Sequence, residues 1–155
     1  MATAPLREQI LALIKTSMEG MTLNDHDVVW DVVRRSPLTS GDRHKRSSLG
    51  MTVVNETKNK VIGKYRCDMV VEFNFFFLAD VADVPDEVAA RVIAGIHKRV
   101  HAQVADGGVL DGLAWNATES SNESLIDGFS DRQIEGRVFF TYQYTHKVGD
   151  QTAVR

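Results

Sequence analysis

Residues 61–79, VIGKYRCDMVVEFNFFFLA, form a long run of strand-forming residues. Every second side chain from Tyr65 to Phe77 is apolar, so these side chains are expected to share one face of a strand. The alternate positions are mostly polar as far as Asn74 and apolar after it, which predicts a strand covered on both faces only at its end. At ~3.3 Å per residue, fifteen such residues reach about 50 Å. A small domain needs less, so part of this strand is expected to project beyond the core.

The segments on either side of this strand predict its partners. Residues 50–56, GMTVVNE, are typical of a strand, and residues 57–60, TKNK, are expected to turn the chain into the long strand. A second long strand is predicted over 134–147, IEGRVFFTYQYTHK, and a shorter one over 113–118, LAWNAT. The pattern of residues 22–36 is mixed and favours a strand or an irregular edge segment.

Two segments have the period of amphipathic helices. Residues 6–18, LREQILALIKTSM, have apolar side chains at helical spacing and are followed by Gly20. Residues 85–106 begin with Pro85, which suits the first helical position, and end before a pair of glycines. The order of elements predicts an α+β fold with a mostly antiparallel sheet of long strands. Both helices are expected to pack on one face, with a long basic hairpin or loop projecting from the sheet.

Three polar segments are expected to be less regular. Residues 39–48, TSGDRHKRSS, are predicted to form a mobile loop, which in a compact domain is either functional or disordered until bound. Residues 119–131 are expected to be a loop or a weakly paired continuation of a strand. The tail from Val148 to Arg155 has no core pattern and is expected to be loose.

Length and composition limit the class of protein. The chain has 155 residues, 43% apolar and 25% charged, which predicts a single domain over residues 1–155. One cysteine excludes an internal disulfide and a multi-cysteine metal site. No apolar run approaches the ~18 residues of a membrane span, and the N-terminal residues lack the pattern of a secretory signal. These features predict a soluble protein inside the cell.

The charges are unevenly distributed along the chain. Residues 34–66 contain nine Lys or Arg and two acids, although the whole chain has a net charge of −3. One interpretation of this basic band is a solvated hairpin rich in Lys and Arg. The other is a surface that meets a polyanion or an acidic partner subunit.

The sequence offers few candidates for catalysis or metal binding. His97 and His101 have metal-ligand spacing, but Lys98 and Arg99 between them repel a cation, so a solvent-facing basic patch is expected. Cys67 lies on the apolar face of the long strand and is expected to pack in the core rather than act as a nucleophile. Several acids lie in polar segments without the spacing of a known metal loop and are expected to be solvated: Asp25, Asp27, Asp31, Glu119, Glu123, Asp127 and Asp131. We therefore predict no enzymatic activity, no metal and no cofactor.

The order of segments resembles the tail terminator proteins of long-tailed bacteriophages. The resemblance lies in an opening helix, LREQILALIKTSM (6–18), a β region with an extended loop, and a long strand, DMVVEFNFFF (68–77). A helix that begins with proline, VPDEVAARVIAGIHKRV (84–100), and a closing aromatic strand with a positive end, RVFFTYQYTHK (137–147), complete it. It spans residues 6–147 and rests on the order and the residue composition of the segments rather than on one motif.

The resemblance implies a structural protein of the virion tail or neck, assembled in the host cytoplasm. Such proteins form a hexameric ring that caps the finished tail tube and stops its polymerisation. The ring also meets the head connector or stopper protein, and genomic DNA passes through its lumen without sequence-specific binding. Our hypothesis places five basic residues at a subunit interface or facing the lumen: Arg43, Lys45, Arg46, Lys58 and Lys60.

Two alternatives remain open at this level. The chain could be another phage neck or head–tail joining protein with a similar layout. It could also be a small nucleic-acid-binding or protein-binding domain that uses the basic band of residues 34–66. No aromatic residue lies between residues 34 and 64, so stacking of bases has little support there.

Overall fold

The computed structural model describes residues 3–42, 45–80, 82–126 and 132–152. They form a mixed sheet of five strands with the order β1-β2-β3-β5-β4. The strands are β1 (Val32–Arg34), β2 (Ser47–Val61), β3 (Lys64–Leu78), β4 (Ala114–Ile126) and β5 (Gln133–Lys147). The helices are α1 (Leu6–Glu19), α2 (Leu23–His26) and α3 (Pro85–Val104). β1 pairs with β2 in parallel and all other pairs are antiparallel, so the predicted α+β class is confirmed.

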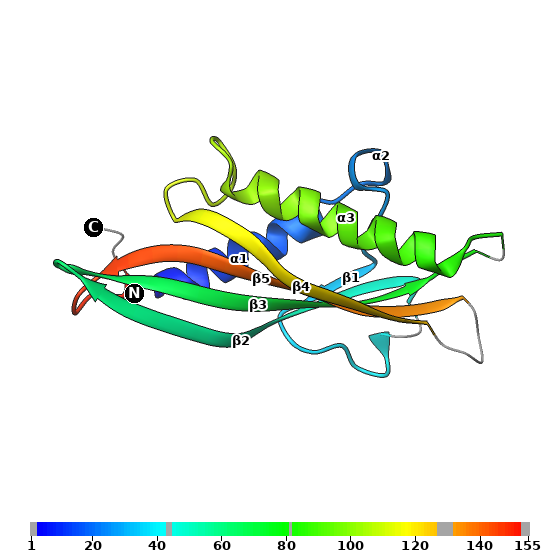
Figure 1. The fold of residues 1–155 in the computed structure, drawn as a ribbon, viewed down its shortest axis with the longest axis horizontal. Coiled ribbons are helices and arrows are strands. Elements are labelled where there is room, and N and C mark those ends of the chain that lie inside the picture. Colours follow the sequence, from blue (N-terminus) through cyan, green and yellow to red (C-terminus); the bar gives the residue numbers. More distant parts are fainter. Residues whose placement is uncertain (1–2, 43–44, 81, 127–131, 153–155) are drawn as a thin grey trace.

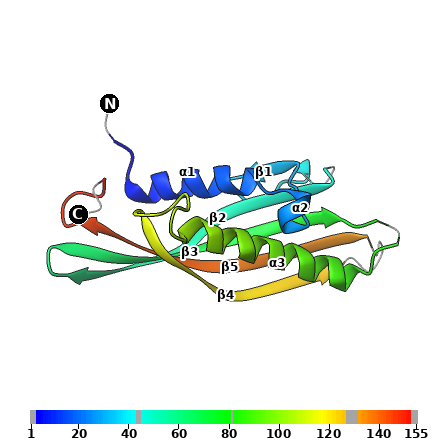
Figure 2. The ribbon, with the colours of Figure 1, turned by 90° about the horizontal axis from the view of Figure 1, so that it is seen from above.

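The molecule has two layers, a long twisted sheet and a layer of helices (Figure 1). Seen from above, α1 and α3 run side by side across the same face, with α1 nearer β1 and β2 and α3 over the other side of the sheet (Figure 2). The predicted placement of both helices on one face is therefore correct. In the described part of the chain, no helix is both long and apolar enough to cross a membrane.

The core lies between these layers and follows the period of β3. Cys67, Met69, Val71, Phe73 and Phe75 are each completely buried beneath the helices. Their partners on β5 alternate in the same way, from Tyr144 opposite Cys67 to Ile134 opposite Phe77. α3 contributes the expected apolar stripe at every fourth residue. Its members Val88, Val92, Ile96 and Val100 are buried, and Val104 at its end is partly buried.

The far end of β3 is covered on both faces, as the loss of alternation predicts. On the face opposite the helices, the chain before β2 lies against the sheet (Figure 1). A Cβ atom at Gly50 would lie 2.6 Å from the carbonyl oxygen of Ser36, so only glycine allows this approach. Phe76, on the same face, is 2% exposed. This end of the sheet therefore has a second small core.

Part of the segment predicted to be a mobile loop is held in place by Asp42. The Asp42 side chain, 3% exposed, accepts hydrogen bonds from the Thr39 N–H at 2.8 Å and from Arg34 Nε at 2.8 Å. The Thr39 hydrogen bond, with help from Arg34, lowers the pKa of the Asp42 carboxyl. The described part of residues 39–48 is thus ordered around a buried carboxylate, which polar composition alone does not indicate.

The predicted turn at residues 57–60 is wrong. β2 runs through these residues to Val61, and the chain turns at Ile62 and Gly63, with Val61 paired with Lys64. Gly63 has φ of 72°, the left-handed conformation that glycine adopts at no steric cost. Both strands of this hairpin therefore have fifteen residues.

Three further expectations need correction. Residues 22–36, expected to be a strand or an irregular edge segment, contain the short helix α2 before the edge strand β1. For residues 119–131 the sequence predicts a loop or a weakly paired continuation of a strand. β4 continues to Ile126 and pairs with β5, so the second alternative is correct as far as that residue. Asp127 and Asp131 lie outside the described residues. The tail is held to the start of α1 at Gln151, whose carbonyl oxygen accepts a hydrogen bond from the Leu6 N–H at 2.8 Å.

Candidate assembly surface

The β2–β3 hairpin extends beyond the ends of α1 and α3 (Figures 1 and 2). At its tip Ile62 is 99% exposed and Val61 is 45% exposed. Residues 58–66, KNKVIGKYR, hold four basic residues and no acid. The tip thus combines an apolar centre with a positive rim.

The base of the hairpin is anchored by a nearly buried carboxylate. Glu56 on β2, with a side chain 9% exposed, accepts a hydrogen bond from the Tyr144 hydroxyl at 2.5 Å. Arg7 at the start of α1 pairs with the other oxygen of Glu56 at 3.0 Å, and Lys58 Nζ lies 3.8 Å from the carboxylate. Burial and the Glu56 hydrogen bond raise the pKa of the Tyr144 hydroxyl. The hairpin therefore leaves the body of the protein in a fixed direction.

The five predicted basic site residues do not lie together. Lys58 and Lys60 lie near the hairpin tip, whereas Lys45 and Arg46 lie just before the other end of β2, about 40 Å away at ~3.3 Å per residue. Arg46 forms an ion pair with Asp80 at that end. Arg43 lies outside the described residues. The basic band of the sequence is thus divided between the two ends of the molecule.

An aromatic side chain, hidden in the sequence, lies beside the basic hairpin. The Arg66 guanidinium carbon lies 5.9 Å from the centre of the Trp115 ring, and Trp115 is 49% exposed. Such a distance suits a cation–π contact. The sequence does not reveal this neighbour, because Trp115 is on β4, far along the chain from residues 34–64.

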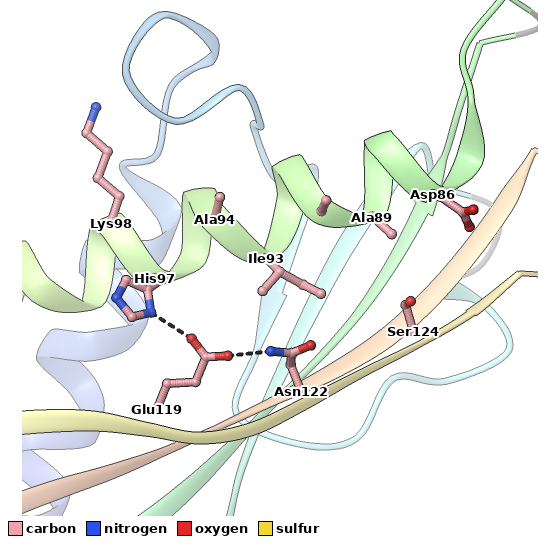
Figure 3. Close-up of a pocket in the computed structure, with 10 residues that line it drawn as sticks. Asp86, Ala89, Ile93, Ala94, His97, Lys98, Glu119, Asn122 and Ser124 are labelled. Atoms are coloured by element: carbon pink, nitrogen blue, oxygen red, sulfur yellow. Dashed lines mark hydrogen bonds and ion pairs between the residues drawn. The ribbon is translucent and has the colours of Figure 1, made fainter.

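A groove of about 820 Å³ lies between α3 and β4 (Figure 3). Its helix wall is mostly apolar, with Ala89, Ala90, Ile93 and Ala94, and its strand wall is polar, with Glu119, Asn122 and Ser124. Asp86, at the beginning of α3, closes one end. The groove is therefore apolar along one side and acidic at Asp86 and Glu119.

Glu119 binds two neighbours in this groove. It accepts from Asn122 Nδ2 at 2.6 Å, and its other oxygen lies 2.7 Å from His97 Nδ1 (Figure 3). Since a carboxylate only accepts, His97 carries its hydrogen on Nδ1. The expectation of a solvated Glu119 is therefore wrong, because its side chain is 19% exposed and bonded to two neighbours, whereas His97 is 43% exposed and faces solvent as expected.

The groove does not assemble a nucleophile with its histidine. Its hydroxyl, Ser124, lies toward Asp86 and away from the imidazole of His97 (Figure 3). A nucleophile and its base need to be within hydrogen-bond reach. Among the residues that the structure describes, no group of three or more His, Cys, Asp or Glu is placed to hold a metal ion.

Two sheet edges are open in the described structure. β4 forms one edge of the sheet, and β1 covers β2 at the other edge only along Ser48–Gly50. Open edges carry unpaired backbone N–H and C=O groups that can pair with another chain. These edges, the hairpin tip and the α3–β4 groove are the surfaces available for assembly.

Cys67 is completely buried, as predicted, and burial raises the pKa of its thiol. Because thiol reagents attack the thiolate, we expect Cys67 in the native protein at about pH 8 to react about 100-fold more slowly than in denaturant. The rate of colour release from an aromatic disulfide reagent measures this difference. An exposed cysteine at the tip, Ile62→Cys, is the control and should react within the mixing time. Rapid labelling of native Cys67 would mean that the helix layer opens readily.

No model of a known protein family matches the sequence, and no curated protein matches it. Surface geometry and the order of segments are therefore the grounds on which a function can be assigned.

Proposed function

We propose that the protein is a structural subunit of a bacteriophage virion, a tail terminator that forms a hexameric ring. The ring would cap the tail tube, end its polymerisation and join the tail to the head connector. The observation that carries the proposal is the hairpin that projects beyond the helices with Ile62 99% exposed at its tip. Exposure of this apolar side chain to water is unfavourable, and its burial against a neighbouring subunit lowers the free energy.

Other features of the molecule support the same assignment. A closed ring needs two different surfaces on each subunit that fit one another. The open edge of β4 and the hairpin tip are different surfaces on different parts of the sheet (Figure 1). Lys58 and Lys60 give the hairpin end of the subunit a positive patch, and the other end has a mixed patch in which Arg46 pairs with Asp80. In the proposed ring, these patches face the lumen or the neighbouring subunits, where DNA and acidic surfaces pass.

The principal test is the state of the purified protein in solution. We expect a six-membered ring with an open channel, seen by light scattering across protein concentration and by negative-stain microscopy of the same peak. Divalent cations should be included, since they screen repulsion between like-charged subunits. A monomer under all of these conditions would contradict self-assembly and with it the proposed function.

A small nucleic-acid-binding domain is the second candidate, favoured by the contact of Arg66 with Trp115 beside Lys64. It requires binding to DNA that falls steeply as salt rises, with a slope set by the number of phosphates neutralised. The separation of the basic residues into two groups weakens this candidate, because it leaves each group with few positive charges. Salt-dependent DNA binding by a monomeric protein would favour it over the ring.

A further inference from the structure

The hairpin tip has the chemistry of an insert. Ile62 and Val61 form an apolar point, with Lys60 and Lys64 beside it. Neither lysine forms an ion pair with a described residue. An insert of this kind fits an apolar recess with an acidic margin, because burial of Ile62 and attraction of the lysines then act together.

The α3–β4 groove has the complementary chemistry. Ala89, Ile93 and Ala94 supply an apolar wall, and Asp86 and Glu119 supply carboxylates. Lys98 also lines the groove, but its ammonium group points away from β4 and donates to the carbonyl oxygen of Asp25 at 2.6 Å (Figure 3). The other wall, β4, contains no Lys, Arg or His. The positively charged tip would therefore meet no lysine or arginine side chain that points into this groove.

Within one chain the tip and the groove cannot meet. β2 and β3 are paired without a gap from Asn55 to Val61, so the hairpin is a continuous ribbon. Val61 and Lys64 near its tip line a pocket with Val104, at the end of α3 opposite to Asp86. Figures 1 and 2 show the tip beyond one end of the helix layer, whereas α3 and the strand wall of the groove lie over the body of the sheet. The occupant that fits the groove is the tip of a second copy.

We propose that Ile62 of one copy inserts into the groove between α3 and β4 of the next copy, with Lys60 and Lys64 close to Asp86 and Glu119. The contact is head-to-tail, so repetition around a closed rotation gives a ring and repetition without closure gives a filament. This inference rests on the proposed ring and names the surfaces that build it. It also assigns the groove to a protein partner rather than to a small molecule, although its volume suits either.

Disulfide trapping tests the contact directly. Two variants, Ile62→Cys and Ala90→Cys, are purified separately, mixed and mildly oxidised. Cys67 stays in place because it is completely buried. We expect a covalent dimer that contains one copy of each variant. Leu23→Cys replaces Ile62→Cys in the control, since Leu23 is 61% exposed but lies on α2, away from the tip. The control mixture should give little of this dimer.

A charged tip gives an independent measurement. Ile62→Asp should raise the protein concentration at which half of the protein is assembled about tenfold or more. It removes the isoleucine that the proposed contact would bury and brings a negative charge to an acidic groove. Leu23→Asp should leave that concentration unchanged. At a protein concentration too low for assembly, thermal unfolding should be the same for both variants and the unchanged protein, since both sites are exposed to solvent in the single subunit. Equal assembly of Ile62→Asp and the unchanged protein would overturn the proposed contact.

The outcomes separate the contact from the function. Rings without the Ile62–Ala90 cross-link would overturn the contact and leave the proposed function intact. A cross-link that joins open filaments or simple dimers would support the contact and contradict the terminator ring. Absence of both cross-link and ring would overturn the two together.

Discussion

Replacing Phe75 with alanine is expected to lower the free energy of unfolding by about 3–5 kcal/mol. Phe75 is completely buried on β3, and its ring lies over Gly136 on β5, the residue paired with it in the sheet. Removing the ring opens a cavity against a glycine that has no side chain to fill it. Since small domains are stable by about 5–15 kcal/mol, this one change removes a large fraction of the total. Urea unfolding followed by fluorescence or circular dichroism measures the loss.

The partner substitution shows whether the ring and the glycine act as a pair. A Cβ atom at Gly136 would lie 2.6 Å from Phe75 Cε1 and 2.8 Å from the carbonyl oxygen of Glu123. Gly136→Ala is therefore expected to cost about 1–3 kcal/mol, although alanine is less flexible than glycine in a strand. Combined with Phe75→Leu, which withdraws the ring, it should cost less than the two single changes added together. Strict additivity would contradict direct packing of the ring on the glycine.

Gly95→Ala in α3 is expected to destabilise the protein by about 1–3 kcal/mol, against the usual direction for a helix. Alanine normally improves a helix by ~1 kcal/mol relative to glycine. Here the added Cβ would overlap the carbonyl oxygen of His26 and lie 3.3 Å from Val28 Cγ1. The backbone of residues 26–28 must then move away from α3. Thermal or urea unfolding of the variant measures the loss.

The neighbouring residue provides the matched control for that change. Ala94 is exposed on the same turn of α3, so Ala94→Gly should cost ~1 kcal/mol through helix propensity alone. The two substitutions thus exchange the same two residue types at adjacent sites and should both destabilise. A gain of stability in Gly95→Ala would mean that residues 26–28 do not press on the helix.

Much of the fold can be predicted because it depends on local periods. The alternation from Tyr65 to Phe77 and the four-residue repeat from Val88 to Val100 each define a buried face, and both are observed. The hairpin turn was misplaced because TKNK is polar, although the glycine with the required positive φ was Gly63. Polarity indicates exposure, and an exposed residue can still be paired in a projecting strand.

The candidate site depends on contacts between segments that are distant in the sequence, so most of it could not be predicted from the sequence. The groove joins His97 with Glu119, which lie on different elements and are brought together by the packing of α3 on β4. The same is true of Glu56 and Tyr144, which anchor the hairpin although they lie 88 residues apart in the chain. The exposed tip had a signal in the sequence, an isoleucine before a glycine within a basic run. Residue type alone could not show that this isoleucine lies at the end of a fifteen-residue arm.

The strand order also shapes how this chain reaches its folded state. β2 and β3 are joined by a two-residue turn, so they can pair soon after collapse, and β4 and β5 are also neighbours in the chain. The seam between β3 and β5 instead joins residues as far apart as Lys64 and Lys147. Closing so long a loop has a large entropic cost, and high contact order slows folding. The two hairpins are therefore expected to form first, and the zipping of β3 onto β5 would be the slow event that completes the hydrophobic core.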